Sequence, residues 1–192
     1  AHGRPVVMFA SSREGEEADF LRALPRDAAV QWLLVPRHPQ RFEEVAGMAM
    51  QAGFSVSRRS AWGSDGPQSA QVWIGDSLGE MALYYGLADA ALLGGSFAPL
   101  GGQNLIEAAA CGCPVVMGPH TFNFAEAAVL AQEADAALEV KDLRTGIDAA
   151  LALVTDTPRQ RAMATAGEQF AAAHRGAARK TAGAILELVK AA

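Results

Sequence analysis

The chain has 192 residues, of which 51% are hydrophobic and 19% are charged, and this composition is typical of a compact globular protein rather than a disordered one. The net charge of −5 at pH 7 argues against a nucleic-acid partner, so an anionic ligand would have to be met by a local site. The longest uncharged runs, 90–106 and 108–125, are interrupted by Gly, Pro, Asn or Gln, and neither predicts a transmembrane helix.

Short apolar runs alternate with amphipathic stretches along the chain, a rhythm that indicates βα units around a mostly parallel sheet. Six strands are expected at 6–10, 30–35, 54–58, 72–75, 90–94 and 114–118, and a short seventh at 136–140. Helices are expected at 41–52, at 77–88, from near residue 104, and throughout most of the chain after 142. We therefore predict a single Rossmann-like, three-layer α/β domain with a mostly parallel sheet of about six strands.

Three helix starts are indicated by the residue types at and near the first helical turn. Ser11 with Glu14, and Ser77 with Glu80, have the spacing of a capping box, and we attribute the nearby Asp76 to the same capping arrangement. Thr157 followed by proline would open a helix with proline in its first turn.

Ligands of open α/β sheets bind beyond the carboxyl ends of the strands. Five segments follow predicted strands, and a site is expected among them: 11–17, 36–42, 75–80, the glycine-rich stretch from 94, and 118–124. The two cysteines, Cys111 and Cys113, are too close for an easy disulfide and too few for a zinc site, which indicates packing residues in a reducing compartment.

The stretch from Gly94 to Gly118 holds six of the nineteen glycines. Gly94, Gly95 and Ser96 end one strand, while Gly101 and Gly102 immediately precede a helix. Glycine lets a ligand approach the main chain without interference from a Cβ, so a phosphate is one candidate guest. Turn formation alone is the other explanation.

Two charged residues have alternative roles. Glu107 follows Asn104 by three residues, so its carboxylate either completes an N-cap or accepts hydrogen bonds from the two hydroxyls of a ribose. Arg37 lies between two prolines, which would aim its guanidinium at a bidentate anion such as phosphate, unless it is only a surface arginine. Its neighbour His38 is interpreted as structural.

Other constellations are weak or missing. His120, Thr121 and Asn123 follow a strand end but are individually typical of turns. The sequence contains no nucleophile elbow, P-loop or metal-ligand cluster, and we expect neither a metal ion nor a cofactor.

Several long motifs together resemble one family. The segment GGSFAPLGGQNLIEAAACGCPVVMGPHTFNFAEA is similar to the signature of the bacterial 3-deoxy-D-manno-octulosonic acid (Kdo) transferases, which attach Kdo from CMP-Kdo to the lipid A precursor in lipopolysaccharide biosynthesis. SSREGEE, PRHPQRF, RRS and GDSLGEMALYYGLADAALLGGS resemble further blocks of that family, in the same order.

The resemblance implies a GT-B glycosyltransferase, in which two Rossmann-like domains enclose the active site. Residues 1–192 would be the CMP-Kdo-binding domain, without the N-terminal domain that carries the membrane anchor, the acceptor surface and a glutamate proposed as catalytic base. The chain alone would then be a soluble fragment that binds the donor without transferring the sugar. The full-length protein would act on the cytoplasmic side of the bacterial inner membrane, contacting the membrane and the lipid A precursor through its missing half.

The resemblance also implies roles for individual residues. Glu107 would bind the ribose, and Arg37 would bind the donor phosphate and stabilise it as the leaving group. The remaining candidate substrate-binding residues are Ser12 at the phosphate, Asp76, Ser77 and Leu78 near the cytosine, and Ser96, Gly101, Gly102, Gln103, Asn104 and Asn123 around the donor pocket. Two departures from the family pattern are Gln103, where members often have histidine and so could hold a cationic ring, and Arg13, also at a frequent histidine position.

Two other functions are kept as alternatives: the donor-binding half of a GT-B enzyme that uses a UDP-sugar, either a transferase or an epimerase, and a non-catalytic nucleotide-binding module. The C-terminal segment 158–192 is expected to be helical, and Ile185, Leu186 and Val189 would face either a missing domain or their own.

Overall fold

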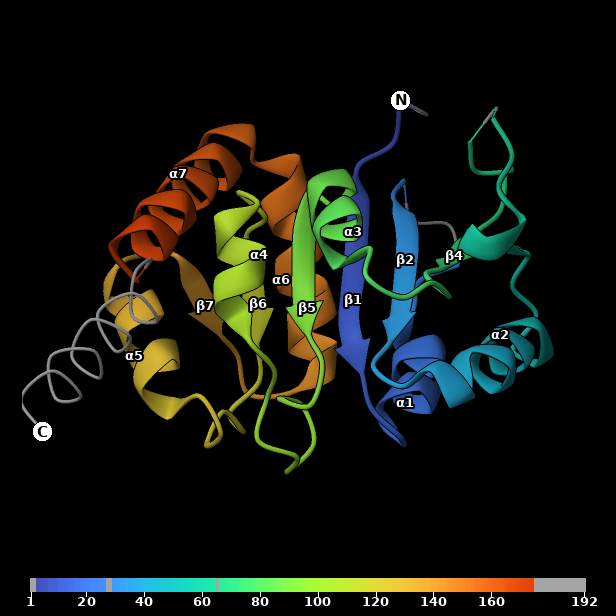
Figure 1. Cartoon of the computed structure of the whole chain (residues 1–192), viewed down its shortest axis with the longest axis horizontal. Coiled ribbons are helices and arrows are strands. Elements are labelled where there is room, and N and C mark those ends of the chain that lie inside the picture. Colours follow the sequence, from blue (N-terminus) through green and yellow to red (C-terminus); the bar gives the residue numbers. More distant parts are fainter. Residues whose placement is uncertain (1–2, 27–28, 65, 175–192) are drawn as a thin grey trace, which may run out of the picture.

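A computed structural model describes residues 3–26, 29–64 and 66–174 (Figure 1). Its centre is a seven-stranded sheet in the order β3-β4-β2-β1-β5-β6-β7, with every neighbouring pair parallel. The strands are β1 (Val6–Ser12), β2 (Gln31–Pro36), β3 (Val56–Arg58), β4 (Val72–Ile74), β5 (Ala90–Leu93), β6 (Val115–Met117) and β7 (Ala137–Glu139). All seven expected strands are confirmed, because each is a short apolar run bounded by turn residues.

Helices cover both faces of the sheet, as Figure 1 shows. They are α1 (Glu16–Ala23), α2 (Phe42–Gln51), α3 (Met81–Leu87), α4 (Leu105–Ala110), α5 (Ala125–Glu133), α6 (Leu143–Thr155) and α7 (Thr157–His174), with 3₁₀ turns η1 (Pro39–Arg41) and η2 (Arg59–Ala61). One buried cluster joins α1, α2 and α6 to the sheet, and a second joins α3, α4, α5 and α7 to its other face. The predicted three-layer α/β domain is confirmed.

Side-chain alternation along β1 shows how the sequence builds two cores from one sheet. Val7 and Phe9 belong to one cluster, while Met8 and Ala10 belong to the other. Successive side chains of a strand point to opposite faces, and a central parallel strand covered on both sides is therefore apolar at every position.

The order of the strands reverses at β1. From β1 the chain crosses to β2 on one side of it, and after β4 it returns to β5 on the other. In open α/β sheets the ligand crevice lies at such a switch point, outside the carboxyl ends of the strands. The topology thus directs attention to the loops that follow β1, β2, β4 and β5.

Two predicted helix starts are wrong. Helix α1 begins at Glu16 with Gly15 at its N-cap, and α3 begins at Met81 rather than at residue 77; neither N-cap residue makes a side-chain cap. The Ser77 hydroxyl instead bonds to the side chains of Glu80 and Tyr84. Ser77 and Glu80 have capping-box spacing, but their side chains bond to each other, to Tyr84 and to Arg59 rather than to backbone amides of α3.

Other local predictions are confirmed. Asn104 caps α4, its Oδ1 accepting a hydrogen bond from the Ile106 amide at 3.1 Å, and α7 begins at Thr157. Both cysteines are free; Cys113 is buried and Cys111 is half-buried, and burial raises the pKa of both thiols. Ile185, Leu186 and Val189 lie outside the described residues.

Within the described ranges, none of the helices combines the length and the apolar character needed to cross a membrane.

Candidate functional site

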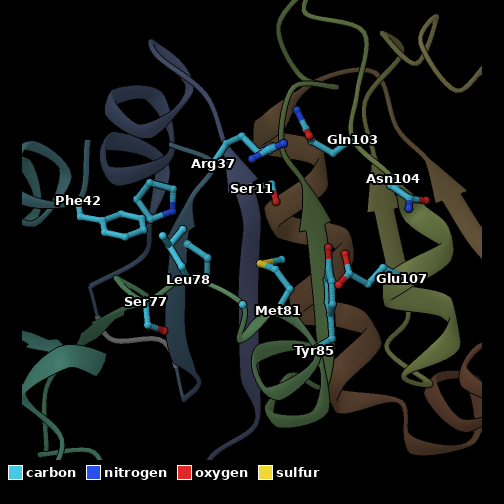
Figure 2. A pocket seen from close by; sticks show the side chains of 13 residues that line it. Ser11, Arg37, Phe42, Ser77, Leu78, Met81, Tyr85, Gln103, Asn104 and Glu107 are labelled. Atoms are coloured by element: carbon cyan, nitrogen blue, oxygen red, sulfur yellow. The ribbon is translucent and has the colours of Figure 1, made fainter. Parts of the chain in front are cut away.

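A pocket of about 290 Å³ opens at the carboxyl edge of the sheet, at the predicted switch point (Figure 2). Its walls come from the segments after β1, β2, β4 and β5. The lining residues are Ser11, Val35, Pro36, Arg37, Phe42, Ser77, Leu78, Gly79, Met81, Tyr85, Gln103, Asn104 and Glu107. Six residues predicted at the sequence level are thus brought together: Arg37, Ser77, Leu78, Gln103, Asn104 and Glu107.

Arg37 is the cation of this pocket. It directly follows β2, where its amide donates a hydrogen bond to the Ser12 carbonyl at 3.0 Å and so ties its backbone to the end of β1. Figure 2 shows the side chain extending over the pocket toward the loop that carries Gln103. The guanidinium makes no hydrogen bond or ion pair within the described residues. A fixed backbone with an unpaired guanidinium can receive an anion without first breaking an internal contact.

Glu107 is the carboxylate of the pocket, in the first turn of α4. Its side chain has no partner in the described part of the chain, whereas Asn104 alone caps the helix. The return arm of a capping box is therefore not formed. In Figure 2 the Glu107 carboxylate points toward the hydroxyl end of Tyr85, inside the cavity. It is an acceptor that remains available to a ligand.

The wall across from Glu107 is mainly apolar. Phe42 begins α2, Leu78 lies on the loop after β4, and Met81 begins α3 (Figure 2). Leu78 is 74% exposed, so a ligand in the pocket can cover its side chain. A flat apolar ring system would be covered by this wall on binding.

Asp76 precedes this wall but does not line the pocket. Its carboxylate accepts hydrogen bonds from Ser60 Oγ and the Ser60 amide at 2.6 and 2.8 Å, and from Arg58 Nε at 2.7 Å. Burial raises the pKa of Asp76, but these hydrogen bonds and the Arg58 charge outweigh it, so the pKa lies below its ordinary value. The explanation of Asp76 by helix capping is wrong: its carboxylate joins β4 to the segment after β3.

The glycines of the 94–102 loop serve close packing. A Cβ on Gly94 would lie 2.4 Å from the Ser11 carbonyl oxygen, and one on Gly101 would lie 2.1 Å from Asn123 Nδ2. Gly95, Gly101 and Gly102 have φ of 72°, 90° and 75°, a region that L side chains rarely adopt. Gly101 and Gly102 therefore lie behind the pocket, against the 120–123 segment, and shape the loop that presents Gln103.

Three further predicted residues are held by protein partners. The Ser12 hydroxyl donates to Glu17 Oε1 at 3.1 Å, and the Ser96 hydroxyl donates to the Leu93 carbonyl and accepts from the Gly118 amide. Asn123 Nδ2 donates to the Leu100 carbonyl at 3.1 Å. The pocket lining includes none of the three.

Seven lining residues were not among the individually predicted site residues: Ser11, Val35, Pro36, Phe42, Gly79, Met81 and Tyr85. Ser11 has a φ of 53° at the irregularity that ends β1, and backbone strain of this kind concentrates at functional sites but is invisible in sequence. Burial raises the pKa of Tyr85, yet its hydroxyl lies at the cavity (Figure 2).

No cluster of three or more His, Cys, Asp or Glu side chains that could hold a metal ion occurs in residues 3–26, 29–64 and 66–174. The charged groups of the pocket are one guanidinium and one carboxylate. This pair suits a ligand with an anionic group and hydroxyl donors.

The fold recurs in solved structures of low sequence identity. At 16% identity, the structure of Anabaena Alr3699/HepE in complex with UDP-glucose superimposes with a TM-score of 0.66, covering 99% of this chain and 50% of that one. A likeness at this identity establishes the fold only. No family model matches the chain.

Two relatives with higher sequence identity to the chain belong to one named family. The chain is 49% identical, over 96% of its length, to the 3-deoxy-D-manno-octulosonic acid transferase of Bordetella pertussis, and 35% identical over 97% to that of Haemophilus influenzae. It covers 45% and 44% of those proteins, so it spans about half the length of the curated relatives it matches.

A solved domain corresponds to nearly the whole chain. The crystal structure of the C-terminal CMP-Kdo binding domain of WaaA from Acinetobacter baumannii is 31% identical, with a TM-score of 0.80, covering 88% of this chain and 90% of that one. The chain belongs to the Kdo transferase family and corresponds to the C-terminal domain of its members. The expected family is confirmed.

Proposed function

We propose that residues 1–192 form the donor-binding domain of a Kdo transferase and bind CMP-Kdo in the pocket at the carboxyl edge of the sheet. One observation carries the proposal: Arg37, from the loop after β2, and Glu107, from the first turn of α4, enter the same cavity, and neither side chain has a partner in the described part of the chain. Membership of the family and the name of the Acinetobacter domain support CMP-Kdo as the ligand.

Each part of the CMP group of the donor is assigned to one set of pocket residues. The phosphate is assigned to Arg37, whose planar guanidinium can bind two phosphate oxygens at once. The ribose is assigned to Glu107, which can accept hydrogen bonds from both hydroxyls. The cytosine is assigned to the apolar wall of Phe42, Leu78 and Met81, where an aromatic ring can stack on the base.

Arg37 also has a role in the transfer reaction. When Kdo leaves the donor, the bond to the phosphate breaks and CMP gains negative charge on that phosphate. A guanidinium fixed beside it interacts more strongly with the transition state than with the intact donor. Removing one such preorganised donor typically costs about 3 kcal/mol of barrier, on the order of a hundredfold in rate.

Transfer requires the other half of the enzyme. By analogy with relatives that are about twice as long, the complete protein would bring a lipid A precursor to this domain from an N-terminal domain at the cytoplasmic face of the inner membrane. The present chain would bind donor and product nucleotide without turnover.

Calorimetric titration of CMP into the chain tests the assignment. We expect saturable binding that Arg37→Ala weakens by about tenfold or more, since a hydrogen bond to a charged group contributes about 1.5–3 kcal/mol. Arg161→Ala is the matched control, because it removes the same charge from an exposed position of α7 outside the pocket. Equal affinity of the Arg37→Ala and Arg161→Ala variants for CMP would refute the site, and preference for UMP over CMP would refute the donor.

A further inference from the structure

Two adjacent glutamates at the start of α1 are buried although neither lines the pocket. Glu16 is 3% exposed and Glu17 is fully buried. Burial raises the pKa of both carboxyls, which shows how far they are removed from water. A buried carboxylate is costly unless it is hydrogen-bonded, so the groups that satisfy these two side chains indicate what they hold.

Glu16 holds the glycine loop. Its two oxygens accept from the Gly95 amide at 2.9 and 2.8 Å, and Oε1 also accepts from the Phe97 amide at 3.3 Å. The Gly95 carbonyl in turn accepts from the Gly102 amide at 2.8 Å, which closes the loop immediately before Gln103. The Gln103 side chain packs over Gly95, where an added Cβ would lie 3.3 Å from its Nε2.

Glu17 holds the segment on the other side of β1. Its Oε1 accepts from the Ser12 hydroxyl at 3.1 Å, and its Oε2 pairs with Arg41 Nη2 at 3.2 Å. Arg41 belongs to η1, only four residues after Arg37, and the Ser12 carbonyl accepts the Arg37 amide. Ser12 and Arg41 thus fix both ends of the turn that presents the free guanidinium.

We propose that Glu16 and Glu17 are positioning residues for the donor pocket, Glu16 acting through Gln103 and Glu17 acting through Arg37. The inference rests on the proposed function, because it assumes that the pocket binds the nucleotide. Both glutamates lie in the first turn of α1, so this turn sets the distance between the pocket wall after β2, which carries Arg37, and the pocket wall after β5, which carries Gln103. The assignment replaces direct phosphate binding by Ser12 with an indirect role for this segment.

Double-mutant cycles on CMP affinity test the two couplings. We expect Glu17→Gln to weaken CMP binding about tenfold in the wild-type background and to have no further effect in an Arg37→Ala background. We expect Glu16→Gln to behave likewise toward Gln103→Ala. A merely structural role would lower affinity by the same factor in every background. Additive effects in both cycles would therefore overturn the proposal.

A measurement on amide hydrogen exchange separates this proposal from the proposed function. In the wild-type chain the Gly95 and Phe97 amides should be protected although they lie in a loop, and fast exchange at both would overturn the anchoring by Glu16 without any variant having to fold. In Glu16→Gln these amides should exchange faster while that of Arg37 does not; the reverse pattern is expected for Glu17→Gln. Asp19→Asn, at an exposed position of the same helix, should change neither.

The two proposals fail in different ways. A wild-type chain that does not bind CMP contradicts the proposed function, whereas normal CMP binding with unprotected Gly95 and Phe97 amides contradicts only the positioning role of Glu16. Equal CMP affinity of Glu17→Gln and wild type contradicts only that of Glu17.

Discussion

The ribose assignment of Glu107 can be tested by deleting one partner from the protein and one from the ligand. Glu107→Gln keeps the shape of the side chain but replaces one acceptor oxygen with an NH₂ donor, so one of the two expected hydrogen bonds to the ribose is lost. The Glu107 carboxylate is exposed and has no other partner, so the loss should fall at the low end for a charged hydrogen bond, about 1.5 kcal/mol. CMP should then bind about tenfold more weakly.

The matching change in the ligand is 2′-deoxy-CMP, which lacks one of the two hydroxyls. Because the deoxynucleotide cannot make that contact with wild-type protein, the same substitution should cost it much less, about threefold or below. The assay is calorimetric titration of both nucleotides into both proteins at one salt concentration. Glu126→Gln controls for the general gain in affinity for an anion when a negative charge is removed, since it lies exposed on α5 outside the pocket. Equal losses for the two nucleotides, or none for CMP, would refute the contact.

Three further predictions concern the wall, the loop and the base. Asp76→Asn should lower the free energy of unfolding by about 1–3 kcal/mol at pH 7, because it weakens the pair with Arg58. Folding lowers the pKa of Asp76 below 3.8, so the stabilisation by the wild-type carboxylate should be present above about pH 4 and be lost as the pH falls through the pKa of the folded state. Denaturant titrations across this pH range would measure the loss. Gly94→Ala should lower the free energy of unfolding by about 1–3 kcal/mol, because the added Cβ clashes with the Ser11 carbonyl, and the Tm should fall by several degrees. Gly86→Ala is the control: open space surrounds Gly86, so this variant should be neutral or stabilising. Equal melting temperatures of the two variants would count against the packing role of Gly94. Phe42→Ala should weaken CMP by about 1–3 kcal/mol while leaving the affinity for ribose 5-phosphate unchanged, and a loss shared by both ligands would place the base elsewhere.

The sequence was sufficient for the architecture. Each strand is a short apolar run with its own turn signals, so the local pattern predicted all seven strands and the parallel arrangement of the sheet. The rule that ligands bind at the carboxyl ends of the strands then directed attention to the loops at that edge, and six of the predicted residues line one pocket there. Arg37 was a candidate because it directly follows the buried strand β2, whereas the ribose role of Glu107, within α4, was implied by the resemblance of its segment to the family.

The tertiary structure decided which polar side chains were already engaged. Asp76 was attributed to helix capping, yet its carboxylate pairs with Arg58 and Ser60, 18 and 16 residues earlier in the chain, and no local pattern encodes that choice. Ser12 was predicted as a phosphate ligand, yet its hydroxyl donates to Glu17 and the residue does not line the pocket.

One physical difference explains why the sequence predicted the strands and helices but did not predict the hydrogen bonds between side chains. Backbone conformation and burial depend on neighbours along the chain, so a sequence predicts elements and edges, whereas a hydrogen bond between side chains depends on which loops meet after folding. The glycine loop illustrates the difference: its composition suggested a bare surface for a ligand, and packing assigned Gly94 to the end of β1 and Gly101 to Asn123. What the loop presents to the pocket is the side chain that follows it, Gln103.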